Sequence, residues 1–223
     1  MAAKLAMIHT VARLAAGYDE LCDELMPDVQ RFHIADEGLL QLLMAAGGMT
    51  PAIYQRFADD AVCAEQAGAD LILLTCSSIS PAADVARSMV SVPVLKIDEP
   101  MADKAVALGR CIGLVGTAET ALKATTQLIQ SRARLAGKEV EVEPTLCAGA
   151  HKLMLAGDMD RHDQLVIGHL RRALQSSDVV VLAQGSMARV ADQIPAAERR
   201  VPILSSPRMG MERVRDVIRQ LTP

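Results

Sequence analysis

Cys76 is the residue of this sequence with the clearest capacity for chemistry. It stands in the segment Thr-Cys-Ser-Ser at 75–78, directly after the aliphatic run 71–74 and shortly before Ser80 and Pro81. Ser as N-cap and Pro at the first position are typical of a helix start, so the pattern predicts a strand, a turn and a helix. The N–H groups of such a turn and the positive end of a helix both favour a thiolate. Because a turn rich in hydroxyl groups is a poor place for a packing cysteine, we expect Cys76 to be reactive.

The remaining cysteines and the histidines suggest neither a metal site nor a disulfide framework. The five cysteines are odd in number and contain no Cys-x-x-Cys pair, and the five histidines contain no His-x-x-x-His pair. We therefore expect no metal. The other four cysteines lie in helix or strand patterns or in a short loop, and we expect them to be packing residues: Cys22, Cys63, Cys111 and Cys147.

An internal repeat gives Cys76 a counterpart. The segment 70–84 aligns with 178–192, and the Val-Pro strand at 92–95 aligns with 201–204 after one inserted residue. Near the N-terminus, Met-Ile-His-Thr at 7–10 aligns with Leu-Val-Gly-Thr at 114–117. Two similar halves would account for nearly the whole chain.

In this alignment the counterpart of Cys76 is Gln184, which is followed by Gly185 and Ser186. A carboxamide donates hydrogen bonds but does not titrate in the usable range, so it cannot shuttle a proton. Gly185 would serve either a close backbone approach to a ligand or a simple turn, and both interpretations stay open. The two halves are therefore chemically unequal at this position.

Further polar side chains end the first strand of each half. Thr10 and Thr117 would place hydroxyl groups at the carboxyl edge of the sheets, although helix capping accounts for them equally well. His9, beside Thr10, could serve as a second acid or base, although a lone histidine is more often packed or solvated.

The elements that must position these residues follow from hydropathy. Each half alternates apolar runs with amphipathic stretches, which is typical of a parallel sheet with helices between its strands. The pattern predicts strands near 4–9, 29–34, 70–75, 92–97, 111–116, 139–143, 178–183 and 201–205. It predicts helices near 12–25, 51–67, 81–89, 119–136, 160–175, 187–198 and 209–221.

The fold class that we expect is α/β, with two similar parallel-sheet domains related by pseudo-two-fold symmetry. Residues 1–98 with 207–223 would form the first domain, and residues 99–206 the second. Open parallel sheets bind ligands beyond the carboxyl ends of their strands. If these ends face each other, the active site lies in the interdomain cleft.

Composition excludes several classes of partner. The 223 residues carry a net charge of −4, so no basic field exists to gather the phosphates of a nucleic acid. Two Tyr, two Phe and no Trp leave little aromatic surface for stacking. The apolar runs are far shorter than the roughly 20 residues of a membrane span, and the N-terminal run is too short for a secretory signal. We therefore expect a cytoplasmic protein with no membrane partner.

These segments resemble the aspartate/glutamate racemase superfamily, which includes hydantoin racemases, maleate isomerases and arylmalonate decarboxylases. The resemblance covers nearly the full chain. It is carried by Thr75–Ser78, Val92–Leu95, Gly113–Thr117 with Thr120, and Asp178–Ala183 with the Gln-Gly-Ser that follows. Members of this superfamily work without a metal or an organic cofactor, through a thiol on each domain that flanks a carbon next to a carboxylate.

The resemblance implies a role for each candidate residue. Cys76 would be the thiol of the first domain, and His9 and Thr10 match a loop where many racemases carry an acid and a hydroxyl group. The positions that hold the substrate carboxylate are matched by hydroxyl-bearing residues of both halves, Ser77, Ser78, Thr117 and Ser186. Gln184 and Gly185 complete the predicted substrate-binding set.

Gln184 departs from the family pattern because it stands where the second catalytic thiol would be. One thiol cannot take a proton from one face of a carbon and return it to the other. The leading hypothesis is a cofactor-independent racemase-type isomerase that uses thiol acid–base chemistry at the α-carbon of a small carboxylate, with a group such as His9 serving the second face.

Other reactions stay open. The alternatives are a single-thiol decarboxylase or lyase, a cis–trans isomerase of a small dicarboxylate, and a non-catalytic two-lobed carboxylate-binding protein. In each case a small carboxylate is the expected partner. We also expect a homo-oligomer, since most soluble oligomers are built from identical subunits.

Overall fold

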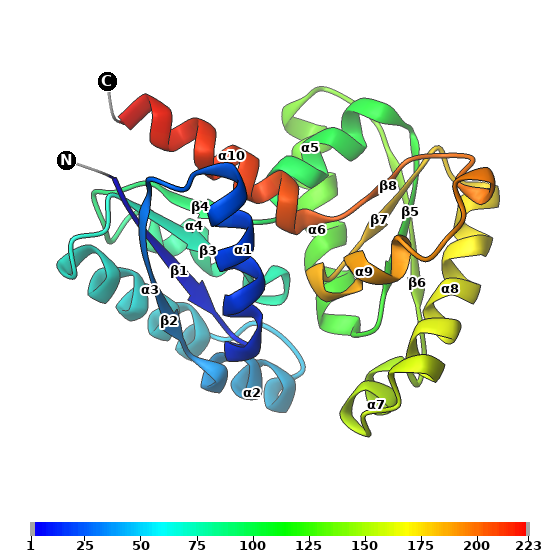
Figure 1. The fold of residues 1–223 in the computed structure, drawn as a ribbon, viewed down its shortest axis with the longest axis horizontal. Helices are drawn as coiled ribbons and strands as arrows, with labels where there is room; N and C mark the ends of the chain where they lie inside the picture. Colours follow the sequence, from blue (N-terminus) through cyan, green and yellow to red (C-terminus); the bar gives the residue numbers. More distant parts are fainter. Residues whose placement is uncertain (1–2, 222–223) are drawn as a thin grey trace. The chain divides into compact units, whose positions relative to one another are not determined.

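The computed structural model describes residues 3–221, and these divide into two compact units. The first contains the described residues up to Asp98 and those from Pro207 onward, and the second contains Glu99–Ser206. Each unit is a four-stranded, wholly parallel sheet with helices packed on it (Figure 1). The expected α/β class with two similar parallel-sheet units is therefore confirmed.

The sheet of the first unit has the strand order β2-β1-β3-β4. Its strands are β1 (Lys4–His9), β2 (Gln30–Ala35), β3 (Leu71–Leu74) and β4 (Val94–Lys96). Its helices are η1 (Ala12–Leu14), α1 (Ala15–Leu25), α2 (Glu37–Ala46), α3 (Pro51–Gln66), η2 (Ser77–Ile79), α4 (Ala82–Ala86) and α10 (Ser206–Leu221).

Strand β3 is apolar throughout because helices cover both faces of the sheet. Ile72 and Leu74 pack with residues of α2, α3 and α4, whereas Leu71 and Leu73 pack with residues of α1 and α10 (Figure 1). All four side chains are fully buried. Continuous aliphatic runs of this kind are typical of central parallel strands, whose carboxyl ends then carry the polar residues.

The second unit repeats this order as β6-β5-β7-β8. Its strands are β5 (Cys111–Gly116), β6 (Glu141–Leu146), β7 (Val179–Leu182) and β8 (Ile203–Leu204). Its helices are α5 (Glu99–Leu108), α6 (Glu119–Leu135), α7 (Ala150–Leu155), α8 (Met159–Ser176), η3 (Gly185–Met187), α9 (Ala188–Ala191) and η4 (Ala196–Glu198). Helices α8 and α9 pack on one face of this sheet through an aliphatic core.

The predicted strands all occur, whereas several helices differ from expectation. Helices α2, α5 and α7 were not predicted. The helix expected over 81–89 is the short α4, whose N-cap is Pro81 and not Ser80. The Ser80 hydroxyl instead donates to a carboxylate, as described below. Within residues 3–221, no helix is both long and apolar enough to cross a membrane.

Candidate active site

Cys76 lies where β3 turns into the short helix η2. Its backbone is extended, with φ −110° and ψ 111°, and it forms the N-cap of η2. The Ser80 N–H donates to the Ser77 carbonyl over 3.2 Å and closes the turn that follows. The Cys76 side chain is half-buried and packs at the margin of the core on the α3 side of the sheet.

Three hydrogen-bond donors lower the pKa of the Cys76 thiol, namely the Thr10 hydroxyl and the backbone N–H groups of Ile79 and Ser78. Burial raises the pKa of the thiol, and the carboxylate of Asp98 adds to that effect, whereas the three donors oppose it. The pKa stays above its ordinary value, so the resting group is the protonated thiol. The same donors stabilise the thiolate when it forms, so the residue can act as a general acid or as a general base.

Asp98, which follows β4, is a candidate site residue that the sequence patterns do not select. Its side chain is fully buried, and its Oδ1 accepts a hydrogen bond of 2.9 Å from the Ser80 hydroxyl. Its Oδ2 has no hydrogen-bond partner within the described structure. Burial raises the pKa of this carboxyl to about 6. The available signal was its position after a strand, at the same edge of the sheet as Cys76.

His9 ends β1 and is fully buried, with both ring nitrogens in contact with other side chains. Nδ1 lies 2.8 Å from Thr75 Oγ1, and Nε2 lies 2.8 Å from His33 Nδ1. Burial, with a further contribution from His33, lowers the pKa of His9 to about 4, so the ring is neutral at neutral pH. An acid–base role for His9 stays a prediction, and it requires one of these contacts to open.

Gln184 has the same place in the second unit that Cys76 has in the first. It follows β7 as the N-cap of η3, with φ −137° and ψ 132°. Its Oε1 accepts hydrogen bonds from the Thr117 N–H at 2.7 Å and from the Thr117 hydroxyl at 3.0 Å. Because a backbone N–H can only donate, this contact fixes the orientation of the amide and directs its Nε2 hydrogens elsewhere.

The predicted site residues thus form two sets, one in each unit. The first set lies at the carboxyl ends of β1 and β3 and contains Thr10, Cys76, Ser77 and Ser78, with His9 buried at the end of β1. The second set lies at the carboxyl ends of β5 and β7 and contains Thr117, Gln184, Gly185 and Ser186. Ser77 and Thr117 are buried, whereas Ser186 is exposed. Their binding roles stay predictions.

The other cysteines differ in exposure. Cys22 and Cys147 are buried and Cys111 is half-buried, but Cys63 is exposed on α3. The expectation that Cys63 packs in the core was wrong, because Ala61 and Ala64 of the same helix face the core instead. Among the side chains that the structure describes, no group of three or more His, Cys, Asp or Glu is arranged to hold a metal ion.

Comparison with known proteins shows the family. The family model described as Asp/Glu/Hydantoin racemase matches residues 35–214, which is most of the chain. This chain belongs to the Asp/Glu/hydantoin racemase family. Membership assigns it to the racemases, which are isomerases. No curated protein sequence matches it.

Solved structures of racemases share its fold. A glutamate racemase from Bacillus anthracis aligns with a TM-score of 0.72 and 16% identity, over 99% of this chain and 83% of that one. A glutamate racemase from Francisella tularensis, solved in complex with D-glutamate, gives a TM-score of 0.73 and 13% identity, over 98% and 82%. An allantoin racemase from Klebsiella pneumoniae gives 0.68 and 14%, over 98% and 89%.

Proposed function

We propose that this racemase-family protein moves a proton at the α-carbon of a small carboxylate without a cofactor, and that Cys76 is its acid–base group. The observation that supports this most directly is the position of Cys76 as the N-cap of η2, where the Thr10 hydroxyl and two backbone N–H groups lower the pKa of its thiol. The sulfur lies beyond the carboxyl end of β3, the edge at which parallel sheets bind ligands.

In the proposed reaction, the Cys76 thiolate takes the proton from the α-carbon, or the thiol returns it. The electron pair of the broken C–H bond passes into the carboxylate, which acquires enediolate-like charge. Hydroxyl and N–H donors stabilise that charge as an oxyanion hole does. We assign this role to Ser77 and Ser78 of the first unit and to Thr117 and Ser186 of the second.

The second face of the carbon needs a different group. Gln184 offers its Nε2 hydrogens, which suit a carboxylate oxygen, but a carboxamide exchanges no proton with a substrate. For racemisation, we propose that His9 exchanges the second proton after its contact with Thr75 or His33 opens. A carboxylate-binding role for Gln184 is compatible with this scheme.

Gln184 also favours a second candidate function, a one-sided reaction such as decarboxylation. Carbon dioxide would leave from the face without a thiol, and the Cys76 thiol would protonate the planar enediolate that remains. The raised pKa of Cys76 suits this reaction, because the thiol then holds its proton until the enediolate forms.

The test uses single enantiomers in deuterium oxide. Single enantiomers of aspartate and glutamate, and a prochiral disubstituted malonate, are each incubated with the protein, and α-deuterium content, optical rotation and gas release are followed. Deuterium uptake with loss of optical rotation supports racemisation, and gas release with a single chiral product supports decarboxylation. Binding of these acids without either change would overturn both proposals in favour of a carboxylate-binding protein.

A further inference from the structure

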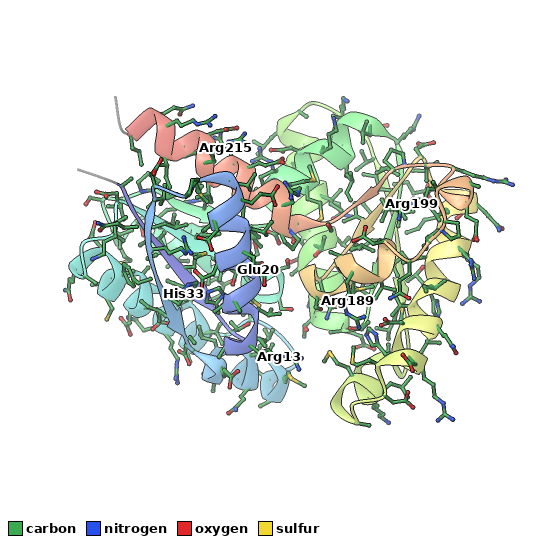
Figure 2. The ribbon with its side chains drawn as sticks, in the orientation of Figure 1. Arg13, Glu20, His33, Arg189, Arg199 and Arg215 are labelled. Atoms are coloured by element: carbon green, nitrogen blue, oxygen red, sulfur yellow. The ribbon has the colours of Figure 1, made fainter. Side chains whose placement is uncertain are left out.

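A chain of hydrogen-bonding contacts runs from the surface of the first unit to the residue before Cys76. Asp19 of α1 lies with its Oδ1 3.2 Å from His33 Nε2, and His33 Nδ1 lies 2.8 Å from His9 Nε2. His9 Nδ1 then lies 2.8 Å from Thr75 Oγ1, which also lies 3.0 Å from the Ile8 carbonyl oxygen. Figure 2 shows His33 on β2, beside α1.

The number of hydrogens that these contacts need fixes the charge on the two histidine rings. If all four contacts are hydrogen bonds, four hydrogens are needed. The Thr75 hydroxyl supplies one, and two neutral imidazole rings supply one each. The fourth must be an added proton, so the pair of His9 and His33 carries a single positive charge when every contact is satisfied.

The charge belongs on His33. The Asp19 carboxylate faces His33, and the hydrogen bond from Arg31, together with that from His33, holds the pKa of Asp19 below its usual value against the effect of burial. His9 is fully enclosed, and burial lowers its pKa to about 4. The pattern is therefore a cationic His33 that donates to Asp19 and to His9, and a neutral His9 that donates to Thr75.

Few other charged groups surround His9 and His33. Helix α1 contributes Tyr18, whose ring centroid lies 5.5 Å from that of His9, and Asp23, which is paired with Arg31 at 2.6 Å. Burial raises the pKa of the Tyr18 phenol, and Cys76 and Asp98 add to that effect. The core residues that α10 contributes to this face of the sheet are apolar: Met211, Val214, Val217 and Ile218.

Losing the added proton rearranges this series of hydrogen bonds. The hydrogen between the rings passes from His33 Nδ1 to His9 Nε2, the hydrogen on His9 Nδ1 leaves to solvent, and the Thr75 hydroxyl turns from the Ile8 carbonyl to His9 Nδ1. Three hydrogens then serve four contacts, so one hydrogen bond between β1 and β3 is lost. Thr10 directly follows β1 and Cys76 lies two residues beyond β3, and the Thr10 hydroxyl lowers the pKa of the Cys76 thiol.

We propose that Asp19, His33 and His9 form a proton-dependent positioning network that holds the ends of β1 and β3, and with them the Thr10–Cys76 contact. Asp19 and His33 are positioning residues, since they act through His9 and Thr75. The link to catalysis rests on the proposed role of Cys76. The protonation pattern does not depend on that role, and it is tested without substrate.

The first experiment is nuclear magnetic resonance of imidazole nitrogens in isotope-labelled protein at about pH 6, near the ordinary range of histidine. His33 should show protons on both nitrogens, and His9 should be the neutral ring with its proton on Nδ1. On raising the pH, the His9 proton should move to Nε2 in the same step in which the pair of rings loses its added proton. A neutral His33 at about pH 6, or a His9 tautomer that does not change, would overturn the proposal.

Matched variants of α1 give the second experiment. Asp19→Asn keeps an acceptor for His33 but removes the charge, and it should move the tautomer change to lower pH by about one unit. Asp23→Asn removes a charge that pairs with the same Arg31 and does not contact His33, so it should leave the step in place. Equal shifts in the two variants would mean that α1 acts only through general charge, which contradicts a specific network.

The pH profile of Cys76 alkylation connects the network to the site. It should contain an inflection at the pH of the His9 tautomer change, and that inflection should move in Asp19→Asn and stay in Asp23→Asn. A Cys76 alkylation profile with no inflection at the pH of the His9 tautomer change would show that the network does not act on the site. The alkylation readout needs no turnover, so this outcome is distinct from a failure of the proposed isomerase activity.

Discussion

At the scale of single residues, the environment of Cys76 balances opposing effects. Burial and Asp98 raise the pKa of the thiol, while Thr10 and the η2 backbone donors lower it. Sequence alone indicated the thiol, its turn and the donors of that turn. It did not select Asp98, although this residue follows a strand, because a carboxylate in that position more often caps a helix than sits fully buried with an oxygen that has no hydrogen-bond partner.

Asp98→Asn should make Cys76 more reactive at neutral pH. The Asp98 carboxyl is ionised above about pH 6, and its charge raises the pKa of the thiol, so a neutral amide should lower that pKa. Each unit of lowering should speed alkylation by about threefold, since the gain in thiolate exceeds the loss of nucleophilicity. Rates are measured at Cys76 by mass spectrometry.

The control for this prediction is Asp59→Asn, which removes an equal charge from an exposed position on α3. It should leave the Cys76 rate near that of the wild type. An Asp98→Asn protein that folds normally and alkylates at the wild-type rate would show that Asp98 does not act on the thiol.

At the scale of elements, β1 and β5 were predicted to the residue because long apolar runs with a polar end leave little choice of boundary. Helix α2 was missed because Glu37–Ala46 is short and carries apolar residues on most of its surface, so its period is ambiguous. Helix α5 was missed because Glu99 follows β4 almost directly. The contact of His9 with His33 depends on strand register, which a single sequence does not specify.

Helix α10 docks closely on the first unit at Gly210. A methyl group there would lie 2.5 Å from the backbone oxygen of Ile97, which cannot move aside as a flexible side chain could. Gly210→Ala should therefore lower the free energy of unfolding by about 1–3 kcal/mol, the usual cost of overpacking. Urea denaturation measures the change.

Gly17→Ala on α1 is the matched control, because nothing lies within 4 Å of the added methyl group. It should leave stability unchanged or raise it by up to about 1 kcal/mol, since Ala favours a helix more than Gly does. If Gly210→Ala stabilised the protein as Gly17→Ala does, the close docking of α10 would be wrong.

At the scale of the whole molecule, the two units share a strand order but differ in their polar residues. At the ends of its strands the first unit carries the Cys76 thiol, the contacts of His9 with His33 and Thr75, and the buried carboxyl group of Asp98. The second carries Gln184 at the equivalent turn and a separate cluster around Asp163 on α8. The repeat could be predicted from sequence because the two halves preserve the same strand patterns. The Asp163 cluster could not, because it joins side chains of α8 and of the α9 region through tertiary contacts.

Asp163 should make the stability of the second unit sensitive to acid. Burial alone would raise its pKa, but hydrogen bonds from Arg189, His162 and Gln193 lower it from 3.8 to about 2. The stabilisation is therefore complete above about pH 4 and is lost as the pH falls toward about 2, by an amount on the order of 2 kcal/mol.

Asp163→Asn should flatten the fall in urea midpoint over this acid range. Asp160→Asn, on an exposed site of the same helix, should leave the fall in place. A wild-type midpoint that stays constant between about pH 4 and about pH 2 would contradict the role assigned to Asp163.

The central claim is that one thiol, Cys76, performs the proton transfer. The most direct measurement is α-deuterium incorporation into the acid that the protein accepts, compared between the wild type, Cys76→Ala and Cys63→Ala, the last removing the exposed thiol of α3. Cys76→Ala should slow incorporation by about 100-fold to 10,000-fold, the usual contribution of general acid–base catalysis, and Cys63→Ala should match the wild type. Incorporation by Cys76→Ala at the wild-type rate would contradict the account.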